Sequence, residues 1–132
     1  METFSVETHR REEMIDITQL VQQAIREGGA TNGMVHCFIP HTTAAITINE
    51  NADPDVTRDI LYKLGKEIPQ LDNYHHSEGN SDAHLKASLI GASEQVLFEN
   101  KKLVLGTWQG IYFCEFDGPR TRRLIVKVIP VG

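Results

Sequence analysis

Short apolar runs separated by polar or turn-forming residues cover much of the chain, and this spacing is typical of β-strands. Most connections between the runs are too short for the crossovers that parallel strands need, so we expect mainly antiparallel sheets. Breaks such as Pro40-His41-Thr42 and Asp117-Gly118-Pro119 mark the ends of individual strands. The predicted strands cover residues 4–8, 34–39, 44–48, 96–98, 103–105, 111–116 and 123–129.

Two segments carry an apolar stripe with helical spacing, and a third, shorter segment lies between helix-capping residues. The second helix has the clearest start, because Asp53 can cap it and Pro54 occupies a position where no backbone N–H is needed. The expected N-caps are Asp16, Asp53 and Ser81, and the expected ends lie near Gly28, Gly65 and Gly91. The pattern predicts an α+β fold in a single domain over residues 1–132, with about three helices covering mostly antiparallel sheets.

Composition narrows the class of protein. Eighteen acidic and thirteen basic residues give a net charge of −5, whereas proteins that coat nucleic acid are usually basic, so we expect no nucleic-acid partner. No apolar run approaches the ~18–20 residues of a membrane helix, and the N-terminus has no signal-peptide pattern. Cys37 and Cys114 lie in apolar runs and are expected to be reduced core thiols. These features predict a cytoplasmic protein without a membrane partner.

Three of the six histidines, His41, His76 and His84, lie in or beside polar segments. Neutral imidazole is a common metal ligand, and three imidazoles leave a coordination position open for water or substrate. The nearby carboxylates of Glu50 and Asp53 would suit Mg²⁺ better than Zn²⁺. The spacing of these histidines matches no standard metal motif, so exposed or packed histidines remain the alternative interpretation.

Two further clusters contain candidate functional residues. Glu50 ends an apolar strand, where a carboxylate can act as a general base, although acidic residues here also suit the start of the following helix. The segment 106–110, Gly-Thr-Trp-Gln-Gly, is unusual as a hairpin turn and is a candidate bulge inside a continuous strand. Within it we expect Trp108 to pack in a core or interface, or to stack on a ligand, and Gln109 to make a directed hydrogen bond.

A basic patch lies at residues 119–123 in this otherwise acidic protein, and arginine is well suited to phosphate recognition. In a strand that starts at Arg123, this side chain shares a face with Lys127, and Arg122 points to the other face. We therefore expect Arg123 to reach a phosphate site, with Lys86 as a further cation. No phosphate-binding glycine loop, dinucleotide-binding fingerprint or serine nucleophile elbow is present.

These motifs together resemble those of the YjbQ-like family, described as secondary thiamine-phosphate synthase enzymes. The resemblance runs through nearly the whole chain and is most specific in the Gly-Thr-Trp-Gln-Gly segment. The other matching segments are Pro40-His41-Thr42, the acidic segment 49–56, His76-x-Glu78-Gly79 and Ala83-His84-x-Lys86-Ala87-Ser88.

The resemblance implies a compact YjbQ-like α+β fold and a homotrimer. It also implies a weak transferase activity that joins a pyrimidine pyrophosphate to a thiazole phosphate and releases pyrophosphate, with help from a divalent cation, Mg²⁺ or Zn²⁺. We take His41, Glu50 and Gln109 as candidate catalytic residues and Arg123, Lys86 and Trp108 as candidate substrate-binding residues; the candidate metal ligands are His41, His76 and His84.

Two other functions remain open at this point. A metal-dependent hydrolase acting on a small phosphorylated substrate would use the same histidines with a metal-bound water. A non-enzymatic oligomeric protein that binds a metal or ligand would instead use the histidines and Trp108 at its interfaces.

Overall fold

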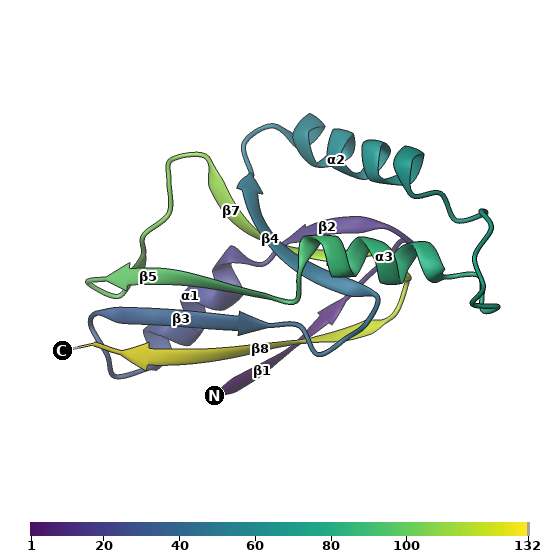
Figure 1. Ribbon diagram of the computed structural model, residues 1–132. Coiled ribbons are helices and arrows are strands. Elements are labelled where there is room, and N and C mark those ends of the chain that lie inside the picture. Colours follow the sequence, from purple (N-terminus) through teal and green to yellow (C-terminus); the bar gives the residue numbers. More distant parts are fainter. Residues whose placement is uncertain (132) are drawn as a thin grey trace.

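Two antiparallel sheets and three helices make up the protein, as the computed structural model describes it for residues 1–131 (Figure 1). The elements confirm the predicted α+β class and the antiparallel pairing. Their bounds are β1 Glu2–Glu7, β2 Glu13–Asp16, α1 Thr18–Glu27, β3 Gly33–Phe38, β4 Ala44–Glu50, α2 Pro54–Glu67, α3 Ser81–Ile90, β5 Ser93–Glu99, β6 Lys102–Leu103, β7 Gln109–Glu115 and β8 Thr121–Pro130.

The larger sheet has the strand order β1-β8-β3-β5-β6, and the smaller sheet has the order β2-β7-β4. Strand β2 was not predicted, since Asp16 was expected to cap the first helix. Asp16 instead ends this edge strand, which pairs with β7, and α1 begins two residues later. The side chain of Asp16 still accepts a hydrogen bond from the backbone N–H of Thr18 at 2.9 Å, so it contributes to the helix start from outside.

The three-stranded sheet is the middle layer of the fold, because apolar side chains cover both of its faces. In β7, Ile111 and Phe113 belong to the main core with the larger sheet and α1. Tyr112 and Cys114 point to the opposite face, where they pack against α3. Burial on both faces explains why the 111–116 segment reads as one continuous apolar run rather than an alternating one.

The two helices on the outer side of the middle layer differ in how firmly they are held. Helix α3 lies along β4, whereas none of the residues of α2 is fully buried and this helix lies at the periphery (Figure 1). Asp53 caps α2 as predicted, accepting a hydrogen bond from Asp55 N at 2.9 Å. The N-cap position of α3 is Asn80 rather than Ser81, and the Asn80 side chain makes no capping bond but donates from Nδ2 to Asp117 Oδ2 at 2.9 Å. Within the described residues no helix is long and apolar enough to cross a membrane.

Candidate active site

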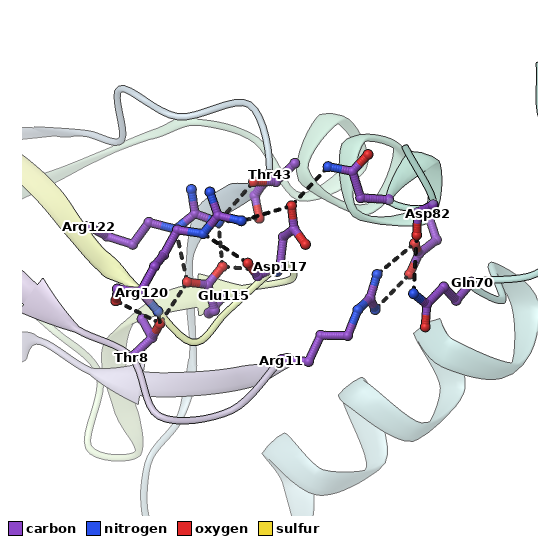
Figure 2. Close-up of polar contacts among 11 residues, drawn as sticks. Thr8, Arg11, Thr43, Gln70, Asp82, Glu115, Asp117, Arg120 and Arg122 are labelled. Atoms are coloured by element: carbon purple, nitrogen blue, oxygen red, sulfur yellow. Dashed lines mark hydrogen bonds and ion pairs between the residues drawn. The ribbon is translucent and has the colours of Figure 1, made fainter. Parts of the chain in front are cut away.

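A buried ion pair lies beside the start of β4. Arg122 is 2% exposed and donates from Nε to Glu115 Oε1 at 2.9 Å and from Nη2 to Glu115 Oε2. The same Nη2 also donates to Thr43 Oγ1 at 2.8 Å (Figure 2). These bonds use Nε and Nη2, while Nη1 makes none with the residues that the structure describes.

Glu115 belongs to the same network and is fully buried. Its carboxylate also accepts from Thr8 Oγ1 at 2.8 Å and from Asp117 N at 3.0 Å. Burial alone would raise the pKa of Glu115, but the hydrogen bonds from Arg122, Asp117 and Thr8 outweigh it and hold this pKa below its ordinary value. Glu115 is therefore ionised, and the Arg122 guanidinium is held in one orientation.

His41 lies next to this pair, in the break between β3 and β4. Its Nε2 accepts a hydrogen bond from the backbone N–H of Arg123 at 2.9 Å. A backbone N–H can only donate, so Nε2 carries the lone pair and the proton of the neutral ring is on Nδ1. Partial burial, followed by the charges of Arg122 and Arg123, lowers the pKa of His41 from its ordinary value. His41 thus presents a neutral Nδ1–H donor.

Three neighbouring cavities share lining residues around His41 and His84, and we call them together the His41 groove. The first cavity, about 520 Å³, is lined by His41, Thr42, Arg120 and Arg122. The second, about 460 Å³, shares His41 and Thr42 with the first and adds His84. The third, about 350 Å³, shares His84 and is lined mainly by apolar surface. Its other lining residues are Tyr74, His75, His76, Ser81 and Leu85. The groove therefore has a cationic end and an aromatic, apolar end.

The three predicted metal ligands do not form one ligand set within the chain. The rings of His76 and His84 meet edge to face, with their centroids 5.5 Å apart. His41 lines the groove with His84, but its only lone-pair nitrogen is already used by the Arg123 N–H. Among residues 1–131 no group of three or more His, Cys, Asp or Glu side chains is arranged to hold a metal ion. Of the three predicted ligands, His76 and His84 are thus in ring contact with each other, and His41 does not join them as a ligand in this arrangement.

The arginines that line the groove differ from the one that the sequence predicted for phosphate contact. Arg123 is exposed and lies on the opposite face of β8 from Arg122, so its contribution to the groove is its backbone N–H. Arg120, whose side chain is about half exposed, lines the cationic end and pairs with Asp117 at 3.2 Å. The geometry thus favours Arg120 and Arg122 over Arg123 for contact with an anion.

Lys86 is held in a second buried network, away from the groove. It is 1% exposed and donates to Glu12 Oε2 at 2.7 Å and to Asp82 Oδ2 at 3.0 Å. Arg11 reaches the same Asp82 with two hydrogen bonds, at 3.0 and 3.1 Å (Figure 2). Burial would raise the pKa of Asp82, but the bonds from Arg11 and Lys86 lower it overall. This network fixes α3 to the segment before β2, and it leaves the Lys86 ammonium no access to the groove.

Glu50, Gln109 and Trp108 lie together at the far end of β4 from His41. Glu50 pairs with Gln109 across the two strands, and Asn51 N donates to the Trp108 carbonyl at 2.9 Å. Segment 106–110 is neither a hairpin nor a bulge in one strand, because it carries the chain from β6 in the larger sheet to β7 in the smaller one. Trp108 is 63% exposed, so it is not part of the core within one chain. Gln109 Oε1 accepts a hydrogen bond from Gly106 N at 2.8 Å and closes the loop locally.

Sequence reasoning missed the buried partners of this site, although two signals pointed to them. Glu115 is the one charged residue of the apolar run 111–116, and a buried carboxylate requires a cation. Arg122 shares its strand face with Leu124 and Val126, which are both apolar, whereas the face of Arg123 includes Lys127. The alternation therefore identifies Arg122 as the arginine that points inward.

The fold and the groove define a class of small α+β proteins in which a histidine and two arginines line the cationic end of a surface groove. Within that class the chain belongs to the UPF0047 YjbQ-like family, whose family model matches residues 2–131. It is 52% identical over 132 residues to the UPF0047 protein YugU of Bacillus subtilis, covering 98% of both chains. It is 51% identical over 126 residues to the UPF0047 protein MJ1081 of Methanocaldococcus jannaschii, covering 96% of this chain and 91% of the relative.

Solved structures show the same fold. A crystal structure of a YjbQ/UPF0047 family protein from Clostridium acetobutylicum superimposes with a TM-score of 0.96 at 59% identity, over 98% of this chain and 100% of that one. A protein from Sulfolobus solfataricus, described as being of unknown function, superimposes with a TM-score of 0.93 at 35% identity, over 98% of this chain and 96% of that one. Family membership and fold are thus established.

Proposed function

We propose that the protein binds a small phosphorylated substrate in the His41 groove and acts as a transferase of the thiamine-phosphate synthase type. The observation that carries this proposal is the polarity of the groove. Arg120, Arg122 and the Nδ1–H of His41 gather at one end, and Tyr74 and Leu85 line the other. Such a groove suits a molecule with a phosphate or pyrophosphate at one end and a heteroaromatic ring at the other.

The proposed reaction requires no protein nucleophile. The thiazole nitrogen forms a bond to the methylene carbon of the pyrimidine, the C–O bond to pyrophosphate breaks, and the electron pair leaves with the pyrophosphate oxygen. Negative charge therefore builds up on the leaving group. The fixed guanidinium of Arg122 and the neutral His41 N–H would stabilise it without reorganisation, because Glu115 and the Arg123 N–H already hold both groups in place.

A divalent cation, Mg²⁺ or Zn²⁺, remains part of the proposal. When bound, it would help to neutralise the phosphates. His76 and His84 are the residues of this chain that would hold it, and two imidazoles suit Zn²⁺ better than Mg²⁺, which prefers oxygen ligands.

A homotrimer is also part of the proposal. One observation that supports self-association is that none of the residues of α2 is fully buried, although the helix carries an apolar stripe. A second is that the edge strands β1, β6, β2 and β4 leave sheet edges that association can cover.

The test is calorimetric binding of inorganic pyrophosphate to the wild-type protein and to two matched arginine variants. Arg120→Ala removes a guanidinium that lines the groove, and Arg123→Ala removes the same charge from the other face of β8 while keeping its backbone N–H. We expect Arg120→Ala to weaken binding about tenfold, the effect of losing one charge-assisted hydrogen bond, and Arg123→Ala to weaken it much less. A larger loss in Arg123→Ala than in Arg120→Ala would return the phosphate contact to Arg123, and no binding to the wild-type protein would overturn the proposal.

Phosphate release assays separate the proposed transferase from a hydrolase. A transferase releases pyrophosphate only when both the pyrimidine pyrophosphate and the thiazole phosphate are present. A hydrolase would release inorganic phosphate or pyrophosphate from one of them alone, and that result would contradict the synthase reaction.

A further inference from the structure

The candidate functional residues lie in two groups at opposite ends of β4. His41 and Thr43 precede the strand, next to Arg122, whereas Glu50 ends it beside Gln109. Seven residues of extended strand separate the groups by about 20 Å, at roughly 3.3 Å per residue. Figure 1 shows the two ends of β4 well apart, with α3 along the strand between them. One copy of the chain therefore cannot bring both groups to one small substrate.

The group at the end of β4, which consists of Glu50, Trp108 and Gln109, has the features of a contact surface. The Trp108 side chain is 63% exposed, yet its backbone is fixed by the bond from Asn51 N to the Trp108 carbonyl. The loop is also closed by Gln109 Oε1 and Gly106 N. A large aromatic side chain on such an ordered loop loses little conformational freedom when it becomes buried, and tryptophan is enriched at the energetic centres of protein interfaces.

Packing within the chain keeps this group in one arrangement. A Cβ atom at Gly110 would lie 2.7 Å from Asn51 Nδ2, so glycine is needed for the Asn51 side chain to lie over β7. Asn51 Nδ2 in turn lies 3.4 Å from Asp16 Oδ2, which joins β2 to the group. The Trp108 loop is therefore built on three strands of the middle layer.

The two ends of β4 carry opposite charge. At one end, Arg120, Arg122 and Arg123 lie near His41 together with the carboxylates of Asp117 and Glu115, which leaves an excess of one positive charge. At the other end, the carboxylates of Asp16 and Glu50 both act on the Tyr112 hydroxyl. A head-to-tail contact between two copies would bring the acidic end of one chain to the cationic end of the next.

We propose that the partner of the His41 groove is a second copy of this chain, whose Trp108 loop and Glu50 complete the site. Each site is then shared by two chains, with the groove from one and the aromatic side chain from the other. Head-to-tail contacts repeat from chain to chain and form a ring when the rotation between neighbours closes, and in the proposed trimer this ring contains three such sites. In the completed site, Trp108 stacks on the substrate ring while Arg120 and Arg122 hold its phosphates. This substrate role rests on the proposed function, whereas the contact between chains does not.

Cysteine cross-linking tests the contact without any substrate. The native Cys37 and Cys114 are buried, and burial raises the pKa of each thiol to about 12, so the unmodified protein gives a low background. A variant with both Thr107→Cys and Thr42→Cys carries one thiol at each end of β4 and keeps the Trp108 side chain. A short bis-maleimide cannot join these two thiols within one chain, because the ends are about 20 Å apart.

The double variant is expected to give covalent dimers and trimers on a denaturing gel, with the ladder ending at the closed ring. Each single variant should remain monomeric on the gel, because neither position meets its own copy in a head-to-tail contact. When the two single variants are co-expressed, cross-linked dimers should form only between unlike chains. Circular dichroism of each variant establishes that it is folded.

A cysteine at a third position distinguishes the head-to-tail contact from association through the larger sheet. Gln95→Cys places a thiol on the outer face of the larger sheet, where Phe38 and Leu97 are exposed. Cross-linking through this position, with none in the double variant, would overturn the proposal in favour of sheet-to-sheet association. A double variant that stays monomeric on the gel would overturn it as well. If the ladder forms but inorganic pyrophosphate does not bind, the contact stands and the proposed function fails.

Discussion

The buried ion pair of Arg122 and Glu115 should make a large contribution to the free energy of unfolding, and a substitution of Arg122 measures it. The variant Arg122→Met keeps much of the side-chain volume but removes the guanidinium, and it leaves the Glu115 carboxylate buried without its cation. Arg122 makes two charge-assisted bonds to Glu115 and further bonds to Thr43. Removal of one partner of such a pair costs about 3–5 kcal/mol, a large share of the ~5–15 kcal/mol by which a typical domain is stable.

A second substitution isolates the cause of this loss. Glu115→Gln added to Arg122→Met removes the unpaired charge, while the amide oxygen can still accept from Thr8 or from the Asp117 N–H. The double variant should therefore recover about 2 kcal/mol of the loss or more. Urea unfolding at one fixed protein concentration measures all three proteins, because the stability of an oligomer depends on concentration. Lys127→Met, at an exposed position of the same strand, is the matched control.

The difference in stability between the wild-type protein and Arg122→Met should depend on pH, and its direction follows from the pKa of Glu115. The folded-state pKa of Glu115 lies below its ordinary value, so its contribution to wild-type stability is present above the unfolded-state pKa and is lost as the pH falls through the folded-state pKa. In Arg122→Met the buried carboxyl is instead unpaired and favours its protonated form. The stability gap between the two proteins should therefore narrow between pH 7 and pH 4. A gap below about 1 kcal/mol at pH 7, equal to that of Lys127→Met, would refute this reasoning.

Four further predictions concern individual residues. Gly110→Ala should lower the free energy of unfolding by about 1–3 kcal/mol, because its Cβ would lie 2.7 Å from Asn51 Nδ2. Gly65→Ala, in α2 with nothing nearby, should raise it by up to about 1 kcal/mol in the same urea experiment, and the opposite order would count against the packing described. The two buried cysteines should react with a thiol reagent only after unfolding, and rapid labelling of the native protein would show that they are accessible. His41 should titrate below the ordinary histidine pKa and keep its proton on Nδ1 in nitrogen-15 NMR spectra, whereas a proton on Nε2 would contradict the bond from the Arg123 N–H.

The local elements were predictable because their signals lie within a few residues of the chain. The Asp53-Pro54 start of α2 and the β3–β4 break at Pro40 are both confirmed. Strand β2 was missed because it is a four-residue edge strand whose only support is its pairing with β7, nearly 100 residues away in the chain. Edge strands of this length have little periodicity of their own.

The site was predictable only in part, because its geometry depends on contacts between distant segments. His41 and His84 were singled out from their polar surroundings, and the structure does bring both of them to one groove. The choice of Arg123 over Arg122 followed from treating either face of β8 as open. Glu115 lies seven residues before Arg122, and the pairing of these two residues shows which face is buried. The position of Trp108 on an exposed loop between two sheets depends on the complete topology.

Product formation is the decisive assay for the proposed transferase, which would join two phosphorylated heterocycles. Purified wild-type protein is incubated with the pyrimidine pyrophosphate and the thiazole phosphate, with Mg²⁺ or Zn²⁺ and without either, and the products are separated by chromatography. We expect thiamine phosphate and pyrophosphate in equal amounts, with a lower rate for Arg120→Ala than for Arg123→Ala. No thiamine phosphate under any of these conditions, from protein that is folded and oligomeric, would contradict the proposal.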